Sequence, residues 1–351
     1  MQSIMSIISQ VAVALLILSG LIIIHEGGHF LFAKLTGIKV LEFSLFMGPK
    51  LFSKKGKETE YSIRAIPIGG FVKMEGEESR SDDKRAFNNK PIWVRMLVVA
   101  GGPAVNILYA ITIYALISYI VLGYCPSTVV SEIMPNSAAE TAGIKAGDKI
   151  LKMDDEKIYT FSQINIHTMQ ADGNEMHITL YRNGIKHEIL ITPKYSDENK
   201  RYMIGIKSLR RTDLFGFIGY GVNHSIWFSK MTFKQIGLIL VGKESVSTLA
   251  GPVGIVTEIG KATVQEPGET VQDVLIRLLS FSAMISLSLG ILNLLPIPAL
   301  DGSKLAIVGV EGIRKKPIPP KIEAYISAVG FAFLIMLIIF VTINDLRRLY
   351  G

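Results

Sequence analysis

Three long apolar runs stand out along the chain and predict helices that could span a membrane. They cover about residues 7–31, 94–122 and 326–343, close to the roughly 20 residues that a bilayer core requires. A fourth apolar run, about 274–295, ends in a proline-rich stretch and is also predicted to span. We therefore expect four transmembrane helices.

Between the first two spans, shorter alternating segments predict strands. Residues 40–46 and 61–66 have strand-like patterns, and 67–74 is predicted to be another extended piece. Gly48-Pro49 and the lysine-rich stretch 54–57 supply turns. We expect a small β-sheet that dips partly into the membrane, with an ordinary cytoplasmic hairpin as the alternative.

Residues 124–207 have a different pattern, with short strands and charged turns. Segments 176–181 and 186–191 alternate on either side of Asn183-Gly184, which is a strong hairpin signal. The stretch resembles a single α+β PDZ domain of the bacterial type. Such domains bind extended peptides by adding a strand to a sheet edge. The alternative is a domain that acts only as a spacer.

Residues 208–270 are harder to interpret. The apolar stretch 215–240 is interrupted by glycines and is predicted to be one or more interfacial helices, with a fifth span left open. Residues 251–255 are rich in turn formers and carry no chemistry that the sequence reveals.

Composition and charge fit an integral membrane protein. The 351 residues are 49% hydrophobic and 19% charged, and the mean hydropathy is +0.38. The net charge of +7 does not indicate nucleic-acid binding, because the basic residues form no single aromatic-interleaved patch. The only cysteine, Cys125, excludes an intrachain disulfide and a cysteine-based metal site. Residues 1–10 contain no Lys or Arg, so we expect a retained helix rather than a cleaved signal peptide.

The distribution of Lys and Arg predicts the orientation. These residues are dense in 34–90 and again in 304–321, so both connections are predicted to be cytoplasmic. Both termini then lie outside, against the weaker signal of Arg347 and Arg348, and the PDZ-like region is extracytoplasmic. The expected organisation is a first span 1–32, a β region 33–93, a second span 94–123, a PDZ domain 124–207, an interfacial segment 208–270, a third span 271–302, a cytoplasmic loop 303–321 and a fourth span 322–346.

The first span contains His25-Glu26-Gly27-Gly28-His29. A charged group at the bilayer centre costs roughly 2.5–3.5 kcal/mol, so polar residues there are functional by default. Two histidines four residues apart lie on one helix face and can bind one metal ion. Glu26 follows the first of them, where its carboxylate can reach a water at the metal. The alternative is a buried histidine pair whose partners lie on neighbouring helices.

A catalytic zinc site needs a third protein ligand. Pro296 and Pro298 cannot continue a helix, and irregular backbone at membrane depth is tolerated only where it is buried or lines a cavity. Asp301 follows directly and is the candidate ligand, with a kinked helix end and a helix N-cap as alternatives. The remaining histidines are expected to be surface, core or interfacial residues: His167, His177, His187 and His224.

Five features in this order resemble the site-2 protease family of intramembrane zinc metalloproteases. They are the motif 25–29, Gly-Gly-Phe-Val-Lys-Met at 69–74, Gly-Gly-Pro-Ala-Val-Asn at 101–106, the PDZ-like region, and Asn-Leu-Leu-Pro-Ile-Pro-Ala-Leu-Asp-Gly at 293–302. Within the family, the chain resembles the bacterial regulator-of-sigma-E protease (RseP-like) group, in a single-PDZ form. Gram-negative members carry two PDZ domains, so regulation that needs a tandem pair is in doubt here.

The resemblance implies a zinc ion held by His25, His29 and Asp301, with Glu26 as general base. It also implies that Asn293 holds the substrate backbone and that Gly69, Gly70 and Phe71 present a strand edge to the substrate. The implied substrates are single-pass membrane proteins, such as an anti-sigma factor or signal-peptide remnants, cleaved in the bacterial plasma membrane.

Two other functions are compatible with parts of the sequence. One is a non-catalytic PDZ membrane adaptor with a structural metal site, which would not need Glu26. The other is a transporter with an intramembrane His/Asp site, which the absence of an inverted repeat argues against.

Overall fold

The computed structural model describes residues 4–77, 79, 81–248, 250–266 and 268–350. The chain divides into two compact units, which are described separately. The first comprises Met1–Ala110 and Thr232–Gly351, and the second comprises Ile111–Met231.

Four helices are long and apolar enough to cross a membrane: α1 (Ile4–Leu35), α2 (Ile92–Ile117), α7 (Val271–Leu294) and α9 (Pro320–Tyr350). They match the four predicted spans, and no further helix in the described residues meets the same criteria. The helix α2 begins in the first unit and ends in the second. The chain is therefore a multi-pass membrane protein.

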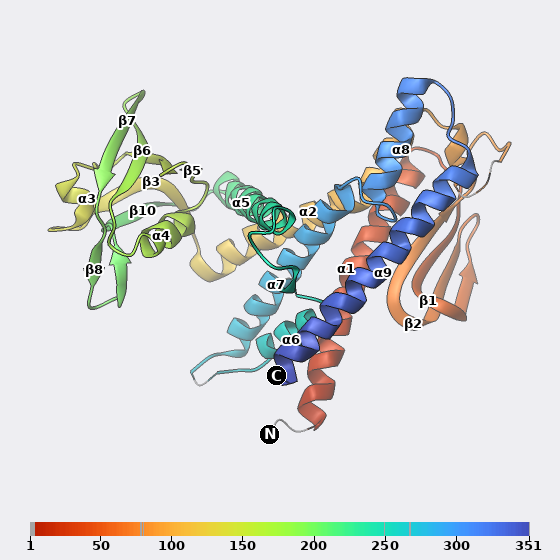
Figure 1. The fold of residues 1–351 in the computed structure, drawn as a ribbon, viewed down its shortest axis with the longest axis horizontal. Coiled ribbons are helices and arrows are strands. Elements are labelled where there is room, and N and C mark those ends of the chain that lie inside the picture. Colours follow the sequence, from red (N-terminus) through yellow and green to blue (C-terminus); the bar gives the residue numbers. More distant parts are fainter. Residues whose placement is uncertain (1–3, 78, 80, 249, 267, 351) are drawn as a thin grey trace. The chain divides into compact units, whose positions relative to one another are not determined.

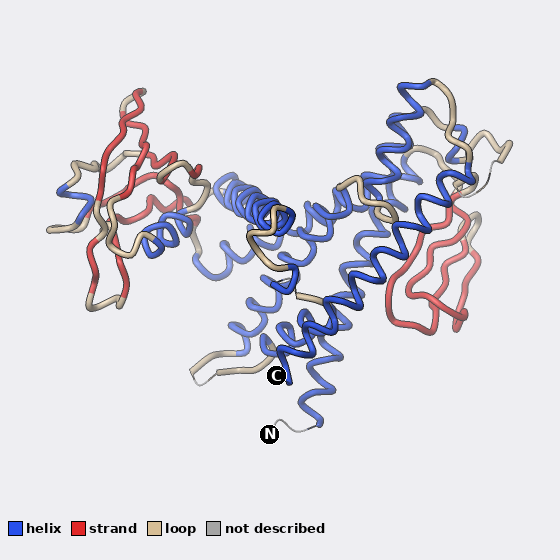
Figure 2. The backbone as a smooth tube through the Cα atoms, viewed as in Figure 1, coloured by secondary structure: helices blue, strands red, loops and turns tan. Residues whose placement is uncertain are grey.

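A bent sheet of two long strands, β1 (Val40–Lys55) and β2 (Glu60–Met74), lies along α1 (Figures 1 and 2). The register divides the two strands into four runs. Residues 42–45 pair with 70–73 on one side and with 60–63 on the other, and 60–64 also pair with 50–55. The predicted third extended piece is thus the second half of β2. Its run 70–74 has no strand on its outer side among the described residues, so it forms an edge.

A small hydrophobic core joins this sheet to the helices. Val40 of β1 and Val98 of α2 are fully buried, and Val72 of β2 packs with them. Burying each such side chain contributes roughly 1.5–3 kcal/mol. The core therefore fixes the sheet against the C-terminal end of α1 and the start of α2.

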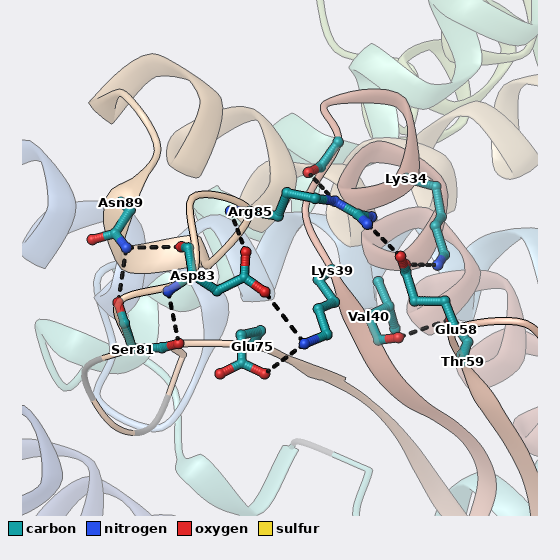
Figure 3. Close-up of polar contacts among 11 residues, drawn as sticks. Lys34, Lys39, Val40, Glu58, Thr59, Glu75, Ser81, Asp83, Arg85 and Asn89 are labelled. Atoms are coloured by element: carbon teal, nitrogen blue, oxygen red, sulfur yellow. Dashed lines mark hydrogen bonds and ion pairs between the residues drawn. The ribbon is translucent and has the colours of Figure 1, made fainter.

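Ion pairs at the surface also hold the end of the sheet that lies next to the C-terminal end of α1 (Figure 3). Glu58 binds Lys34 at 2.6 Å and Arg85 at 2.5 Å, and Lys39 binds Asp83 at 3.3 Å. Arg85 and Lys34 lower the pKa of Glu58 to about 2. Single exposed pairs contribute little, but this network joins the end of α1, the start of β1 and the loop after β2.

The connection between the third and fourth spans is helical, not a loop throughout as predicted. Residues Asp301–Arg314 form α8, whose Ile307 and Val308 are buried. Two ion pairs hold this helix: Arg95 of α2 binds the buried Glu311 at 2.6 Å, and Lys304 binds Glu77 at 2.5 Å. These contacts fix both ends of α8.

A short helix, α6 (Pro252–Ala262), follows the 3-10 turn Val246–Thr248 and contacts α1, α7 and α9. The carboxylate of Asp345, on α9, accepts hydrogen bonds from the Gly251 and Gly254 amides at 3.2 and 2.7 Å. These amides begin α6, so a buried carboxylate from another helix caps its positive end. The stretch 251–255, whose role the sequence did not reveal, provides the backbone amides that bind the Asp345 carboxylate.

The second unit is an α+β domain followed by a long helix. Its main sheet is antiparallel in the order β10-β3-β4-β6-β7, with β5 beside β4. The predicted hairpin is present, since Asn183 and Gly184 both have positive φ between β6 and β7. The elements are β3 (Cys125–Ile133), α3 (Ala138–Thr141), β4 (Lys149–Met153), β5 (Glu156–Lys157), α4 (Phe161–Gln170), β6 (Met176–Arg182), β7 (Ile185–Ile191), β8 (Lys194–Ser196), β9 (Arg201–Met203), β10 (Ile206–Arg211) and α5 (Leu214–Leu240).

The glycines in 215–240 do not interrupt α5, which is one continuous helix. Within the second unit, His224 of α5 lies among the rings of Tyr114, Tyr220 and Trp227. Burial lowers the pKa of His224 to about 4, so this histidine is a neutral packing residue at pH 7.

The second unit contains an ion pair between the buried Asp148 and Arg182. Asp148 accepts hydrogen bonds from Arg182 at 2.7 and 2.6 Å and from the Lys145 amide at 2.8 Å. Burial alone would raise the pKa of Asp148, but these bonds outweigh it and lower the pKa below 3.8. The stabilisation is thus complete above pH 3.8 and is lost as the pH falls through the lowered pKa.

We predict that Asp148→Asn lowers the unfolding free energy of the isolated segment 123–212 by about 3 kcal/mol, because Arg182 then loses its charged partner. Urea denaturation followed by circular dichroism measures the change. Glu132→Gln is the matched control, since the Lys207–Glu132 pair is more than half exposed and should contribute at most about 1 kcal/mol. Equal effects of the two substitutions would contradict the prediction.

Candidate metal centre

The helix α1 presents His25 and His29 on one face, one turn apart. Their Nε2 atoms lie 3.3 Å from each other, and the two rings meet edge to face. Both side chains are largely buried, with 12% and 11% exposed. The predicted pair of ligands therefore converges on one point.

Asp301 reaches the same point from a distant part of the sequence. Its Oδ2 atom lies 3.0 Å from Nε2 of His25 and 3.3 Å from Nε2 of His29. The helix α7 ends at Leu294, the chain is irregular through the two prolines, and α8 begins at Asp301 itself. The residue at the N-cap of α8 is Leu300, which makes no side-chain cap. The carboxylate therefore does not cap its own helix and faces the histidines, so the N-cap alternative is wrong.

The donor set fits a zinc ion. Tetrahedral coordination at about 2.0–2.1 Å puts ligand atoms about 3.3 Å apart, close to the separations of 3.0–3.3 Å between these three atoms. Two imidazole nitrogens and one carboxylate oxygen, with the fourth position left free, are typical of catalytic zinc. Within the described residues, this is the one cluster of histidine, cysteine and carboxylate side chains with such geometry.

The side chain of Asp301 is 21% exposed, against 12% and 11% for His25 and His29. Asp301 also borders a cavity of about 440 Å³ that separates it from part of α9. The lining residues are Ala299, Leu300, Asp301, Ser303, Lys304, Ser327, Ala328 and Phe331.

The second nitrogen of His29 has a defined partner. Its Nδ1 atom lies 2.9 Å from the carbonyl oxygen of Val98 on α2, to which an Nδ1–H donates. In the neutral ring, this bond places the proton on Nδ1 and leaves Nε2 available to a metal. No pattern in the sequence points to Val98, because the contact uses a backbone oxygen.

Glycines allow α1 and α2 to approach this closely. A Cβ atom on Gly28 would collide with the carbonyl oxygen of Gly101. One on Gly102 would overlap Nε2 of His29 and lie 2.9 Å from Cε1 of His25. The glycines of the 101–106 motif therefore form the surface of α2 against which both histidines pack.

Glu26 lies between the histidines and the sheet edge. A Cβ atom on Gly70 would be 3.3 Å from Cγ of Glu26 and 3.6 Å from Ile22, so β2 contacts α1 beside the predicted base. About two turns before Glu26, the Ser19 hydroxyl donates to the carbonyl oxygen of Pro67 at 3.4 Å. The edge that includes Gly69 and Gly70 thus lies along the face of α1 that carries Glu26.

In the part of the chain that the structure describes, no hydrogen bond, ion pair or ring contact joins the side chains of the other predicted substrate-binding residues, Phe71 and Asn293, to the histidines or Asp301. The ring of Phe71 lies 4.9 Å from the guanidinium of Arg64, within the sheet. Asn293 lies in the last turn of α7, half-buried, and its side chain makes no hydrogen bond to another described residue. The roles of Asn293, Gly69, Gly70 and Phe71 in substrate binding stay predictions.

We predict that Gly28→Ala removes bound zinc, because the added methyl group pushes α2 and its Gly102 away from the histidines. Zinc in the purified protein can be measured by inductively coupled plasma mass spectrometry. Gly27→Ala is the matched control in the same motif, since a Cβ atom at Gly27 has nothing within 4 Å. Full zinc occupancy in both variants would contradict the close approach of the helices.

Known proteins similar to this chain include zinc metalloproteases. The family model described as Peptidase family M50 matches residues 13–337. A candidate zinc metalloprotease of Clostridium acetobutylicum is 39% identical over 96% of this chain and 97% of its own length. The regulator of sigma-W protease RasP of Bacillus subtilis is 28% identical over 98% of this chain and 99% of its own length. The zinc metalloprotease RasP of Geobacillus kaustophilus is also 28% identical, over 96% of this chain and 97% of its own length.

Proposed function

This chain belongs to peptidase family M50, and from that premise we propose that it hydrolyses peptide bonds in or near the transmembrane segments of single-pass membrane proteins. It is a zinc metalloprotease, as its family and relatives are. The observation that carries the proposal is the convergence of Asp301 with His25 and His29, at 3.0 and 3.3 Å, inside a set of membrane-spanning helices. In this proposal His25, His29 and Asp301 hold the zinc ion.

Glu26 is proposed as the general base and acid. Zinc, when bound, supplies a Lewis acid that polarises the scissile carbonyl and makes water more acidic. The Glu26 carboxylate takes a proton from the attacking water and returns it to the amine that leaves. Its place beside His25 and against Gly70 puts it between the metal ligands and the sheet edge, where a substrate carbonyl would lie.

The sheet edge is proposed to hold the substrate in an extended form. A transmembrane helix hides its carbonyls in hydrogen bonds, so it must unwind before cleavage, and each freed polar group costs several kcal/mol in lipid. The outer edge of the run 70–74 offers backbone groups that can replace those bonds by β-addition. The free side-chain amide of Asn293 is a further candidate to bind the unwound backbone.

We propose that the second unit is a PDZ domain on the extracytoplasmic side. Its antiparallel order leaves β10 at an edge, and a cavity of about 620 Å³ runs beside it. An extended peptide could add to β10 there, which fits a domain that senses the extracytoplasmic part of a substrate. By analogy with the RasP relative named for sigma-W regulation, an anti-sigma factor is one candidate substrate, and signal-peptide remnants are another.

We predict that Glu26→Gln keeps zinc but abolishes cleavage of a membrane-embedded reporter, because an amide cannot accept the proton. Asp301→Ala should lower zinc content as well as cleavage, because one ligand is lost. Immunoblotting of the reporter and metal analysis of the same preparations check both. Cleavage at the wild-type rate by the Glu26→Gln protein would refute the catalytic assignment, and unchanged zinc in Asp301→Ala would place the third ligand elsewhere.

The orientation can be tested because the chain has one cysteine. In a Cys125→Ser background, we expect Lys186→Cys to react with a membrane-impermeant maleimide in intact protoplasts. Lys54→Cys should react only after the membrane is opened, because the β1–β2 connection is predicted to be cytoplasmic. Both positions are exposed, so burial does not limit either reaction. The reverse labelling pattern would invert the proposed topology.

A further inference from the structure

Asn106 is a fully buried amide that faces His25 from α2. Its side chain is 0% exposed, and Nδ2 as placed lies 3.2 Å from Nδ1 of His25. Its Oδ1 atom is also buried and has no hydrogen-bond partner among the described residues. A buried polar group in a membrane-spanning helix is costly, so this arrangement requires an explanation.

Contacts with α7 fix the position of Asn106. Its backbone oxygen accepts a hydrogen bond from the Ser286 hydroxyl of α7 at 3.0 Å, and Ser286 is itself fully buried. One turn further along α7, a Cβ atom on Gly290 would lie 3.4 Å from Cβ of Asn106 and 2.9 Å from the oxygen of Pro103. The backbone of α7 therefore packs directly against this part of α2 and leaves the Asn106 side chain little freedom.

The amide as placed conflicts with metal binding by His25. Nε2 of His25 faces Asp301 and His29, so this nitrogen must keep its lone pair for a metal, and the ring proton then sits on Nδ1. An Nδ1–H needs an acceptor, but Nδ2 of Asn106 is a donor. The oxygen and nitrogen of an amide side chain are assigned from the hydrogen bonds they make.

Rotating the amide by half a turn removes the conflict. Oδ1 then lies next to Nδ1 of His25 and accepts its proton, while the nitrogen takes the position of the unpartnered atom. With the proton on Nδ1, the rotation lowers the number of unpaired amide atoms from two to one, because the ring and the amide now share a hydrogen bond. His29 has the equivalent arrangement, since its Nδ1–H donates to the Val98 oxygen on the same helix.

We propose that Asn106 is a positioning residue that accepts the Nδ1–H of His25 and so holds this ring in the tautomer that binds metal through Nε2. The inference rests on the proposed metal site at His25, His29 and Asp301. Acceptors of this kind orient metal-binding histidines, and their loss typically lowers metal affinity by about 10–100-fold.

The test measures zinc affinity of the full-length protein in detergent by competition with a chromophoric chelator. Asn106→Leu keeps a similar volume without an acceptor and should weaken zinc binding by about 10–100-fold. Asn106→Asp can only accept, so it should bind zinc at least as tightly as the wild type. If Asn106→Leu does not fold, Asn106→Ala removes the same acceptor without branching and is expected to weaken binding by a similar factor.

Tyr109→Phe is the matched control on the same helix. It removes a hydrogen bond to Ser282 of α7, 2.9 Å long, from a residue one turn beyond Asn106. Zinc affinity should stay unchanged in this variant, which separates the role of the amide from general packing between α2 and α7.

Two results would overturn the inference. One is zinc affinity in Asn106→Leu or its alanine substitute that equals the wild type. The other is an Asn106→Asp protein as weak as Asn106→Leu, which would mean that the amide acts as a donor. The proposed function fails differently: His25→Ala and Asp301→Ala would then bind zinc as tightly as the wild type.

Discussion

The close contact between the backbones of α1 and α2 is the constraint on which the site depends. Gly28 and Gly101 meet without room for a side chain, and Gly102 lies directly under the two histidine rings. This contact brings the Val98 oxygen within hydrogen-bond distance of His29 and puts Asn106 beside His25. The orientation of both rings therefore follows from small residues that have no chemistry of their own.

Asp301, the proposed third ligand, is a charged group among apolar helices, and its position depends on a break in the helix before it. The prolines end α7 early, so Asp301 can begin a new helix with its carboxylate directed at the histidines. That helix is then held at its two ends by Lys304–Glu77 and Arg95–Glu311. The buried carboxylate of Glu311 thus has a charged partner, as buried charges require.

The sheet adds the element that a protease of membrane segments needs. It is anchored to α1 by a small hydrophobic core, to which Val72 contributes, and by ion pairs around Glu58. Among the described residues, no strand pairs with the outer edge of the run 70–74, whose Gly70 lies beside Glu26. A rigid edge next to the proposed base suits a substrate that must be held extended. The α+β domain of the second unit has its own hydrophobic core.

The sequence determined the local features of this protein. Apolar runs of sufficient length gave the four spans, Asn183-Gly184 gave a hairpin, and the spacing of His25 and His29 put two ligands on one face, because each signal depends only on neighbouring residues. Asp301 could be proposed because prolines and an acidic residue are unusual at membrane depth. The tertiary structure alone decided the rest: the helical form of 301–314, the cap from Asp345 onto α6, and the contacts of Val98, Gly102 and Asn106 with the histidines. These depend on which helices touch and how closely, which is set by packing between residues far apart in the chain and leaves no periodic pattern in the sequence.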